Sequence, residues 1–246
     1  MTDFGYREVK DEEKATLVRG VFSSVARRYD LMNDLMSGGI HRFWKDAMVE
    51  WLNPQPGQRI VDVAGGTGDI AFRIAGLARR RGGSAEIIVC DINAEMLAEG
   101  VRRAEELDEQ DVLWACGDAE RLPISTSSMD ACTIAFGVRN VTHVDAALSE
   151  ACRILKPGGR FLCLEFSRVE MPGLDALYER YSFVVLPRLG EWVAQDGESY
   201  RYLAESIRRF PSQAAFGKMI ERAGLSRVRI RNLAGGIAAM HSAWRL

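Results

Sequence analysis

The sequence predicts an α/β fold, a doubly wound and mostly parallel sheet of seven strands whose last strand is antiparallel. From residue 59 onwards, short apolar runs alternate with segments of helical periodicity. This alternation is typical of parallel strands joined by right-handed helical crossovers. Near the end of the chain two strand-like runs meet at Gly235 and Gly236, and so tight a connection makes the last pair antiparallel.

Each element follows from its local pattern. Short apolar runs predict strands at 59–64, 86–91, 112–118, 130–137 and 160–166, and the most continuous of these are expected to be buried on both faces. Apolar residues at every third or fourth position predict helices between them, at 69–80, 93–107 and 144–155. The "KPGG" turn at 156–159 is expected to end the last of these helices and to start the fifth strand. A helical insert to about residue 210, a helix at 212–224 and the final strand pair complete the chain.

The 246 residues are predicted to form one domain, because 47% of them are hydrophobic and no linker rich in Pro, Gly or Ser divides the chain. We expect four parts within it: an N-terminal helical lid, a cofactor-binding core, a helical substrate insert, and a C-terminal helix with the strand pair. Their predicted bounds are 1–50, 51–167, 168–211 and 212–246.

Composition excludes several function classes. The net charge of −2 supplies no concentrated basic surface for nucleic acid, and the basic clusters at 79–81 and 227–231 are expected to be solvated faces. The five cysteines contain no C-x-x-C pair and indicate small core residues in a reducing cytosol. No apolar run approaches the roughly 20 residues of a membrane span, and the first residues lack an apolar signal core. We therefore expect a cytoplasmic protein whose contact with the inner membrane is at most peripheral and transient.

Polar residues and glycines follow the predicted strands. In a doubly wound sheet the ligand lies at the carboxyl ends of the strands, near the point where strand order reverses. The residues at these ends are Gly65, Gly66, Gly68, Asp91, Asp118, Arg139 and Asn140. Asp91 lies about 20 residues past the glycine turn, the spacing at which an acid accepts hydrogen bonds from a ribose diol. An N-cap for the next helix is an equally good interpretation of Asp91 taken alone.

The stretch "VDVAGGTGDIAF" at 61–72 indicates which ligand approaches the backbone. It satisfies the G-x-G-x-x-G/A dinucleotide fingerprint, in which a pyrophosphate sits on the helix N-terminus. Asp69 stands in that first turn, where a carboxylate would fill the anion site and repel a phosphate. A ligand with adenine, ribose and positive charge fits better, and S-adenosyl-L-methionine has these properties. Asp118, followed by Ala119, is placed to accept from the adenine amino group.

Several motifs carry a family resemblance. "VDVAGGTGD", "DINAEML", "GDAERLP" and "RILKPGGRFLCLEFS" resemble successive motifs of class I, Rossmann-like methyltransferases that use S-adenosylmethionine. Outside the cofactor core, four stretches are similar to C-methyltransferases of ubiquinone and menaquinone biosynthesis: "YDLMNDLMSGGIHRFWK" (29–45), "FGVRNV" (136–141), "YRYLAESIRRFPSQ" (200–213) and "GGIAAMHSAWR" (235–245). The resemblance covers almost everything beyond the first dozen residues.

The resemblance implies a set of cofactor contacts. Together with the glycine turn, the set of cofactor-binding residues that we predict is Gly65, Gly66, Thr67, Asp91, Ile92, Asp118, Ala119 and Ala135. Ala135 departs from the family pattern, because many members have serine there. A hydrogen bond from that position to the cofactor is therefore absent or supplied by water.

The implied reaction is methylation of a ring carbon of a polyprenyl quinol. A phenol has a pKa near 10, so the site must remove the hydroxyl proton or stabilise the anion that forms. We expect Arg139 to bind the developing oxyanion, Asn140 to orient a water or the hydroxyl, and Asp69 to be the base, with His143 as second choice. The alternative for Arg139 is a surface salt bridge. Predicted substrate-binding residues are Tyr29, His41, Arg139 and Tyr181.

The N-terminal segment and the insert are expected to shape the substrate site. Residues 14–45, with a hinge at Gly38 and Gly39, and residues 168–198 are predicted to lie together above the carboxyl edge of the sheet. Their aromatic and aliphatic side chains would form a groove for the polyprenyl tail. The alternative is that the apolar stripe of the insert belongs to the core.

Other functions stay open at this point. No two histidines have metal-ligand spacing, and a sulfonium donor requires no metal. An NAD(P)-linked oxidoreductase is disfavoured, because no Tyr-x-x-x-Lys pair follows the fourth strand. A non-catalytic subunit that binds S-adenosylmethionine within a quinone-synthesis complex is the other alternative. The sequence leaves open whether the substrate is a benzoquinol or a naphthoquinol, the length of its tail, and assembly as a homodimer or in such a complex.

Overall fold

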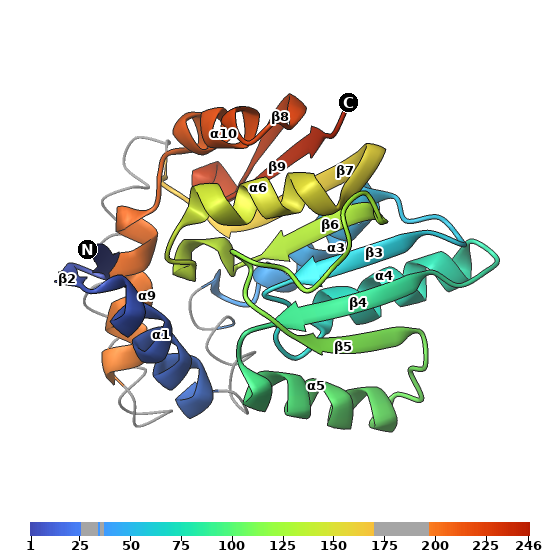
Figure 1. Cartoon of the computed structure of the whole chain (residues 1–246). Helices are drawn as coiled ribbons and strands as arrows, with labels where there is room; N and C mark the ends of the chain where they lie inside the picture. Colours follow the sequence, from blue (N-terminus) through green and yellow to red (C-terminus); the bar gives the residue numbers. More distant parts are fainter. Residues whose placement is uncertain (26–33, 35–36, 170–196) are drawn as a thin grey trace.

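The structure is a computed structural model, and it describes residues 1–25, 34, 37–169 and 197–246. Its main sheet has seven strands in the order β5-β4-β3-β6-β7-β9-β8 (Figure 1). The strands are β3 (Arg59–Val63), β4 (Glu86–Asp91), β5 (Val112–Cys116), β6 (Met129–Ala135), β7 (Leu155–Phe166), β8 (Ser226–Leu233) and β9 (Ala238–Trp244).

Strand directions confirm the predicted fold class. Neighbouring strands from β5 through β7 are parallel, and β9 runs antiparallel to both β7 and β8. Strand order proceeds outward from β3 to β5 and then returns to β6 on the other side of β3. This reversal opens a crevice at the carboxyl ends of β3 and β6, where doubly wound sheets bind ligands.

Helices cover both faces of the sheet. One apolar cluster joins the sheet to α3 (His41–Leu52), α4 (Asp69–Arg80) and α5 (Ala94–Glu106). The other joins it to α6 (Val144–Ile154) and α10 (Gln213–Arg222). In Figure 1, α6 lies in front of the sheet and α3 and α4 lie behind it. The helical stripes expected from the sequence are the buried faces, and in α4 they include Ile70, Ala71, Ile74, Ala75 and Ala78.

The helix N-termini differ in how they are capped. Asn93 accepts hydrogen bonds from the backbone N–H groups of Glu95 and Met96 at the start of α5, and Ser212 caps α10 in the same way. Helix α4 has no side-chain cap, and its N-cap residue, Gly68, has a left-handed backbone with φ of 81°. The start of α4 lies at the crevice beside β3, where Asp69 and Ile70 line a pocket.

The fifth strand is longer than the sequence predicts. Strand β7 begins at Leu155, so the "KPGG" turn lies within its bounds. Its register to β6 shifts between the pairs Met129 with Leu155 and Ala131 with Arg160, so residues 156–159 bulge out of the ladder. Gly158 and Gly159 instead exchange backbone hydrogen bonds with Arg245.

An N-terminal hairpin is an element that the sequence analysis did not anticipate. Strands β1 (Thr2–Phe4) and β2 (Arg7–Val9) form a separate antiparallel pair, and α1 (Asp11–Val25) follows directly. The hairpin packs on α9 (Gly197–Arg209), because the ring of Phe4 stacks on Tyr202 with centroids 4.2 Å apart. In Figure 1, α1 and α9 lie beside the strand ends at which the arrowheads of the parallel strands point. Among the described residues, no helix is long and apolar enough to cross a membrane.

Candidate functional site

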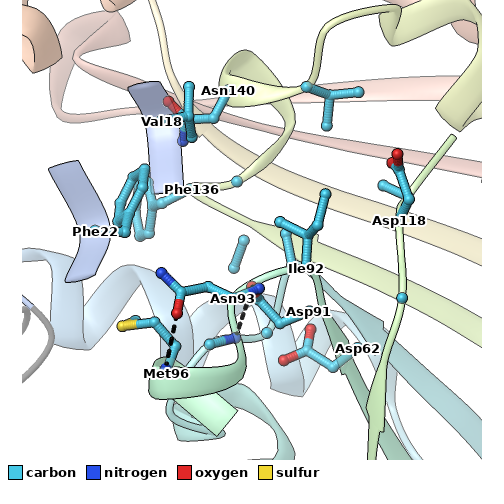
Figure 2. Close-up of a pocket in the computed structure, with 18 of the residues that line it drawn as sticks. Val18, Phe22, Asp62, Asp91, Ile92, Asn93, Met96, Asp118, Phe136 and Asn140 are labelled. Atoms are coloured by element: carbon cyan, nitrogen blue, oxygen red, sulfur yellow. Dashed lines mark hydrogen bonds between the residues drawn. The ribbon is translucent and has the colours of Figure 1, made fainter. Parts of the chain in front are cut away.

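A pocket occupies the carboxyl ends of β3, β4, β5 and β6. Figure 2 shows Asp91, Ile92 and Asn93 on one side of it, and Phe136 and Asn140 on the other. The predicted cofactor-binding residues are all among those that line it: Gly65, Gly66, Thr67, Asp91, Ile92, Asp118, Ala119 and Ala135. The sequence prediction therefore placed these residues together correctly, although their contacts with a ligand stay a prediction.

The glycine turn is shaped so that backbone, not side chains, borders the pocket. A Cβ on Gly65 would lie 2.6 Å from Oδ2 of Asp62, and one on Gly66 would lie 2.9 Å from the methyl carbon of Met96. Gly66 also has a φ of 54°, in the left-handed region that favours glycine. Glycine is therefore required at both positions, because a side chain would collide with Asp62 or Met96.

Two residues that lack the conformational freedom of glycine also adopt a left-handed backbone conformation here. Ala64 follows β3 with a φ of 52°, and Phe136 follows the neighbouring β6 with a φ of 56°. Both line the pocket. Such conformations cost about 1–3 kcal/mol each and gather at functional sites, where surrounding packing enforces them.

The carboxylate of Asp91 accepts hydrogen bonds from backbone N–H groups of two different loops at the edge of the pocket. Its Oδ2 accepts from the N–H of Gly66 at 2.9 Å, and its Oδ1 accepts from the N–H of Asn93 at 2.8 Å. The N-cap of the following helix is Asn93, so the capping interpretation of Asp91 is wrong. The side chain borders the pocket, and a carboxylate has more lone pairs than these hydrogen bonds use, as binding a ribose diol requires.

Asp62 is a buried acid with an unused oxygen. Only 1% of the residue is exposed, and Oδ1 accepts from the Thr133 hydroxyl at 2.7 Å. Oδ2 has no hydrogen-bond partner among the described residues, although it is buried and the residue lines the pocket. Burial raises the pKa of Asp62 to about 7. The sequence analysis assigned this residue no role, because its partner Thr133 comes from another strand.

Asp69 is neutralised by two cations. Lys45, whose side chain is 4% exposed, places Nζ 2.7 Å from Oδ2, and Arg73 donates from Nε to Oδ1 at 3.1 Å. Burial alone would raise the pKa of Asp69, but the charges of Lys45 and Arg73 bring it down to about 2. A carboxylate engaged at both oxygens with so low a pKa is a weak base for a phenol, which argues against the predicted role. Lys45 itself lines the pocket and was missed, since nothing local in the sequence pairs it with Asp69.

Arg139 lies elsewhere than expected. It is not one of the described residues that line this pocket. Its Nη1 donates to Oε1 of Glu165 at 2.6 Å and to the carbonyl of Phe136 at 2.7 Å. The ion pair is buried, so neither the predicted direct contact with the substrate oxygen nor the surface salt bridge describes it. Asn140, the next residue, does line the pocket.

The other predicted site residues are two histidines, which the structure describes, and two tyrosines, which it does not. His41 is buried at the start of α3, where Nε2 lies 2.8 Å from Oδ1 of Asp34, and it is outside the pocket lining as described. His143 is half exposed and lies between Asp11 and Glu120. Tyr29 and Tyr181, with the apolar stripe of the insert, lie outside the described residues.

Helix α1 forms the wall of the pocket opposite the sheet, and a lid movement of this segment stays a prediction. The residues it contributes to the lining are Ala15, Val18, Arg19 and Phe22. Hydrogen bonds hold α1 in place: Lys14 Nζ donates to the carbonyl of Val141 at 2.9 Å, and Asn93 Nδ2 donates to the carbonyl of Arg19 at 3.4 Å. Nε2 of His143 also lies 3.2 Å from Oδ2 of Asp11. Figure 2 shows Val18 and Phe22 at the pocket.

Comparison with known proteins extends the resemblance to nearly the whole chain. A sequence model described as the ubiE/COQ5 methyltransferase family matches residues 7–245. The chain belongs to the ubiE/COQ5 methyltransferase family. The predicted family resemblance and enzyme class are thereby confirmed.

Two similar proteins match along nearly their whole length. The protein of Caulobacter vibrioides, named ubiquinone/menaquinone biosynthesis C-methyltransferase UbiE, is 55% identical over 99% of this chain and 97% of its own. The protein of the same name from Paracoccus denitrificans is 56% identical over 100% of this chain and 97% of its own.

Solved structures of more distant methyltransferases share the fold. An S-adenosylmethionine-dependent methyltransferase from Aquifex aeolicus superposes with a TM-score of 0.60 at 14% identity, over 97% of this chain and 100% of that one. A Haemonchus contortus phosphoethanolamine N-methyltransferase, solved with S-adenosyl-L-methionine, gives 0.63 at 15% identity over 97% of this chain and 60% of that one. At such identities the likeness concerns the fold alone.

Proposed function

We propose that this member of the ubiE/COQ5 family transfers the methyl group of S-adenosyl-L-methionine to a ring carbon of a polyprenyl quinol. Family membership and the full-length identity to proteins named ubiquinone/menaquinone biosynthesis C-methyltransferases support the reaction. One structural observation carries the choice of cofactor. The unpartnered Oδ2 of Asp62 is buried at a pocket that also has Asp91 and Asp118 in its wall, and such a site suits a cation and repels phosphates.

The pocket residues match the parts of this cofactor one by one. Asp91 would accept from the ribose hydroxyls, and Asp118 from the adenine amino group. Asp62 would accept from the ammonium group of the methionine part, which supplies the partner that Oδ2 lacks. Lys45, with Nζ donors beyond the one given to Asp69, would bind the methionine carboxylate. When bound, the cofactor supplies a methyl group on an activated sulfonium.

On the substrate side, the residues available favour hydrogen-bond stabilisation of the quinol oxygen over proton abstraction by a carboxylate. Asp69 is tied to Lys45 and Arg73, and Arg139 is tied to Glu165. Asn140 lines the pocket with a neutral amide, whose N–H groups can donate to the ring oxygen as negative charge develops. We therefore propose Asn140 as the direct donor, with Arg139 supporting the turn that presents it.

The substrate is a demethylated benzoquinol, demethylmenaquinol, or both. The test is an assay of the purified protein with both quinols and methyl-labelled S-adenosylmethionine, each quinol carrying zero to three isoprene units. Label in the ring of at least one quinol is expected. Absence of turnover with both, despite cofactor binding, would favour the alternative of a non-catalytic subunit. Calorimetry with NADH tests the oxidoreductase alternative and should show no binding.

The tail series also tests contact with the membrane. A polyprenyl quinol resides in the bilayer, and no described helix crosses it, so we propose that the protein meets its substrate at the membrane surface. Since each buried methylene contributes about 0.8 kcal/mol at most, kcat/KM should rise with tail length. Equal kcat/KM for all tails would contradict the predicted groove for the polyprenyl tail. Assembly as a homodimer or within a quinone-synthesis complex is a further proposal, tested by sedimentation.

A further inference from the structure

The amide oxygen of Asn140 accepts a hydrogen bond, which leaves the amide N–H groups to serve as donors in the pocket. The hydroxyl of Tyr202, on α9, donates to Oδ1 of Asn140, with 3.0 Å between the two oxygen atoms. A side-chain amide is planar, and its oxygen and nitrogen point in different directions. With Oδ1 engaged by Tyr202, the two N–H donors of Asn140 are turned away from Tyr202. Figure 2 places Asn140 across the pocket from Asp91.

Tyr202 is itself fixed from several sides. The residue is 5% exposed, and its ring is stacked on Phe4 with centroids 4.2 Å apart and planes 19° apart. The hairpin that carries Phe4 is anchored to the same helix, because Oε2 of Glu205 accepts from the N–H of Tyr6 at 3.0 Å. The aromatic stack and this hydrogen bond leave the Tyr202 hydroxyl little freedom to point elsewhere.

We propose that Tyr202 is a positioning residue, which holds the Asn140 amide so that its N–H groups face the oxygen of the quinol ring. The inference rests on the proposed function, since it needs a substrate oxygen in the pocket. Without Tyr202 the amide can rotate and offer its oxygen to that place, where a lone pair would repel a developing oxyanion. Burial also raises the pKa of Tyr202, so the hydroxyl stays a donor at neutral pH.

A purely structural role for Tyr202 predicts different results. A hydroxyl that only satisfies a buried acceptor affects folding stability, and its loss leaves the chemistry of bound substrate unchanged. A hydroxyl that orients an oxyanion donor affects kcat at saturating substrate. It also affects the pH at which the bound quinol ionises, because a misoriented amide no longer stabilises the phenolate.

The experiment compares Tyr202→Phe with Ser206→Ala in the full chain, using the quinol that the wild-type protein methylates. Ser206 is a matched control, because its buried hydroxyl lies on the same helix and, among the described residues, donates only to the carbonyl of Leu203. For Tyr202→Phe we expect kcat to fall tenfold or more, a kcat profile displaced to higher pH, and a cofactor Kd within twofold of wild type. Ser206→Ala should match the wild type in all three.

A double-mutant cycle decides whether the effect passes through Asn140. In an Asn140→Ala background, Tyr202→Phe should change kcat by less than twofold. Equal losses with and without Asn140, or a kcat within twofold of wild type in the single variant, would overturn the inference.

If Tyr202→Phe does not fold, Asn140→Asp replaces it, since a carboxylate keeps the acceptor for Tyr202 and removes the donors. Its kcat should fall at least tenfold, and an unchanged kcat overturns the inference. Failure of the wild type to methylate either quinol is a separate result that refutes the proposed function.

Discussion

Glu165 and Arg139 form an ion pair in which Oε1 and Nη1 are 2.6 Å apart and the two side chains are 2% and 1% exposed. Glu165 lies in β7, and its two oxygens also accept from the backbone N–H groups of Phe166 and Arg139. The guanidinium in turn reaches the carbonyl of Phe136, the strained residue at the pocket wall. The pair therefore fixes the turn after β6, from which Asn140 enters the pocket.

We predict that Arg139→Ala lowers the free energy of unfolding by about 3–5 kcal/mol, because it leaves the Glu165 carboxylate buried without its partner. Urea denaturation measures the effect. Arg102→Ala is the control, since Arg102 is half exposed and pairs with Glu99 and Glu106 on the surface of α5, and it should change stability little. Equal effects of the two substitutions would contradict a structural role for the buried pair.

The pair can also be replaced as a unit. The double substitution Arg139→Met with Glu165→Leu should recover part of the lost stability, because no unpaired charge remains. The recovery is incomplete, since the backbone N–H groups of Phe166 and Arg139 lose their acceptor. Since Arg139 is not among the described residues of the pocket lining but supports the turn that presents Asn140, methyl transfer by the folded double variant should fall by less than 100-fold. A loss of 100-fold or more would instead support the direct oxyanion contact expected from the sequence.

Asp91 provides the second prediction. Asp91→Asn should weaken S-adenosylmethionine binding by about 1.5–3 kcal/mol, the usual range for hydrogen bonds to a charged acceptor. The matched control is Asp130→Asn, because Asp130 lies on β6 and accepts from the backbone N–H of Arg59 at 2.8 Å, but is not among the pocket-lining residues. Titration calorimetry measures both variants. A folded Asp91 variant with wild-type affinity would refute the ribose assignment.

The strands and helices whose burial shows in the local sequence were predicted well. Features of the fold that depend on contacts between residues far apart in the chain were not. Continuous apolar runs identified β3 and β4, and helical periodicity gave the bounds of α4, because each pattern reflects burial of that segment alone. The place of the glycine turn and of Asp91 in the pocket could be predicted because both lie at the carboxyl ends of these strands. The hairpin of Thr2–Phe4 and Arg7–Val9 is too short for a periodic signal, and its packing depends on Tyr202, far along the chain.

The candidate site shows the same division. Sequence placed Arg139 and Asn140 at a strand end, but side-chain direction there is set by the turn of Val138–Asn140, which sends one into the core and the next to the pocket. The low pKa of Asp69 depends on Lys45, from another helix. A pattern of residue types along the chain contains neither of these facts.

The third prediction concerns attachment of the lid at different pH. His143 lies 2.7 Å from a carboxylate oxygen of Glu120 and 3.2 Å from one of Asp11, the first residue of α1. The Glu120 hydrogen bond and charge, followed by those of Asp11, raise the pKa of His143. A raised histidine pKa contributes stability that is complete below pH 6.5 and is lost as pH rises through the folded-state pKa.

Helix α1 should therefore open more readily in alkaline solution. We expect amide protection in α1, corrected for intrinsic exchange rates, to fall by about two- to fivefold from pH 6 to pH 8.5, as for an exposed ion pair. In His143→Gln the same comparison should show little change, while Lys14 still holds the helix to the carbonyl of Val141. An equal pH response in this variant would show that another group controls the lid.

The last prediction follows from Asp62, whose pKa burial raises to about 7. Below that pH the carboxyl is largely protonated and neutral, and above it the charged form can pair with the ammonium group of the cofactor. Binding must therefore release a proton in acid solution, so affinity rises with pH up to about 7. Of the charged groups near Asp62, Asp69 has a pKa of about 2 and pairs with Lys45. Burial also raises the pKa of Asp91, so the variant Asp62→Asn is needed to assign the change to Asp62.

S-adenosylmethionine should bind roughly five- to tenfold more tightly at pH 7.5 than at pH 6, as expected for one group with a pKa near 7. Calorimetry at pH 6 in two buffers of different ionisation enthalpy should show release of close to one proton. Asp62→Asn should bind more weakly at pH 7.5 and lose the pH dependence, because the amide that replaces the acid does not titrate. Affinity of the wild type that is independent of pH would mean that the unpartnered oxygen of Asp62 does not meet the cationic end of the cofactor.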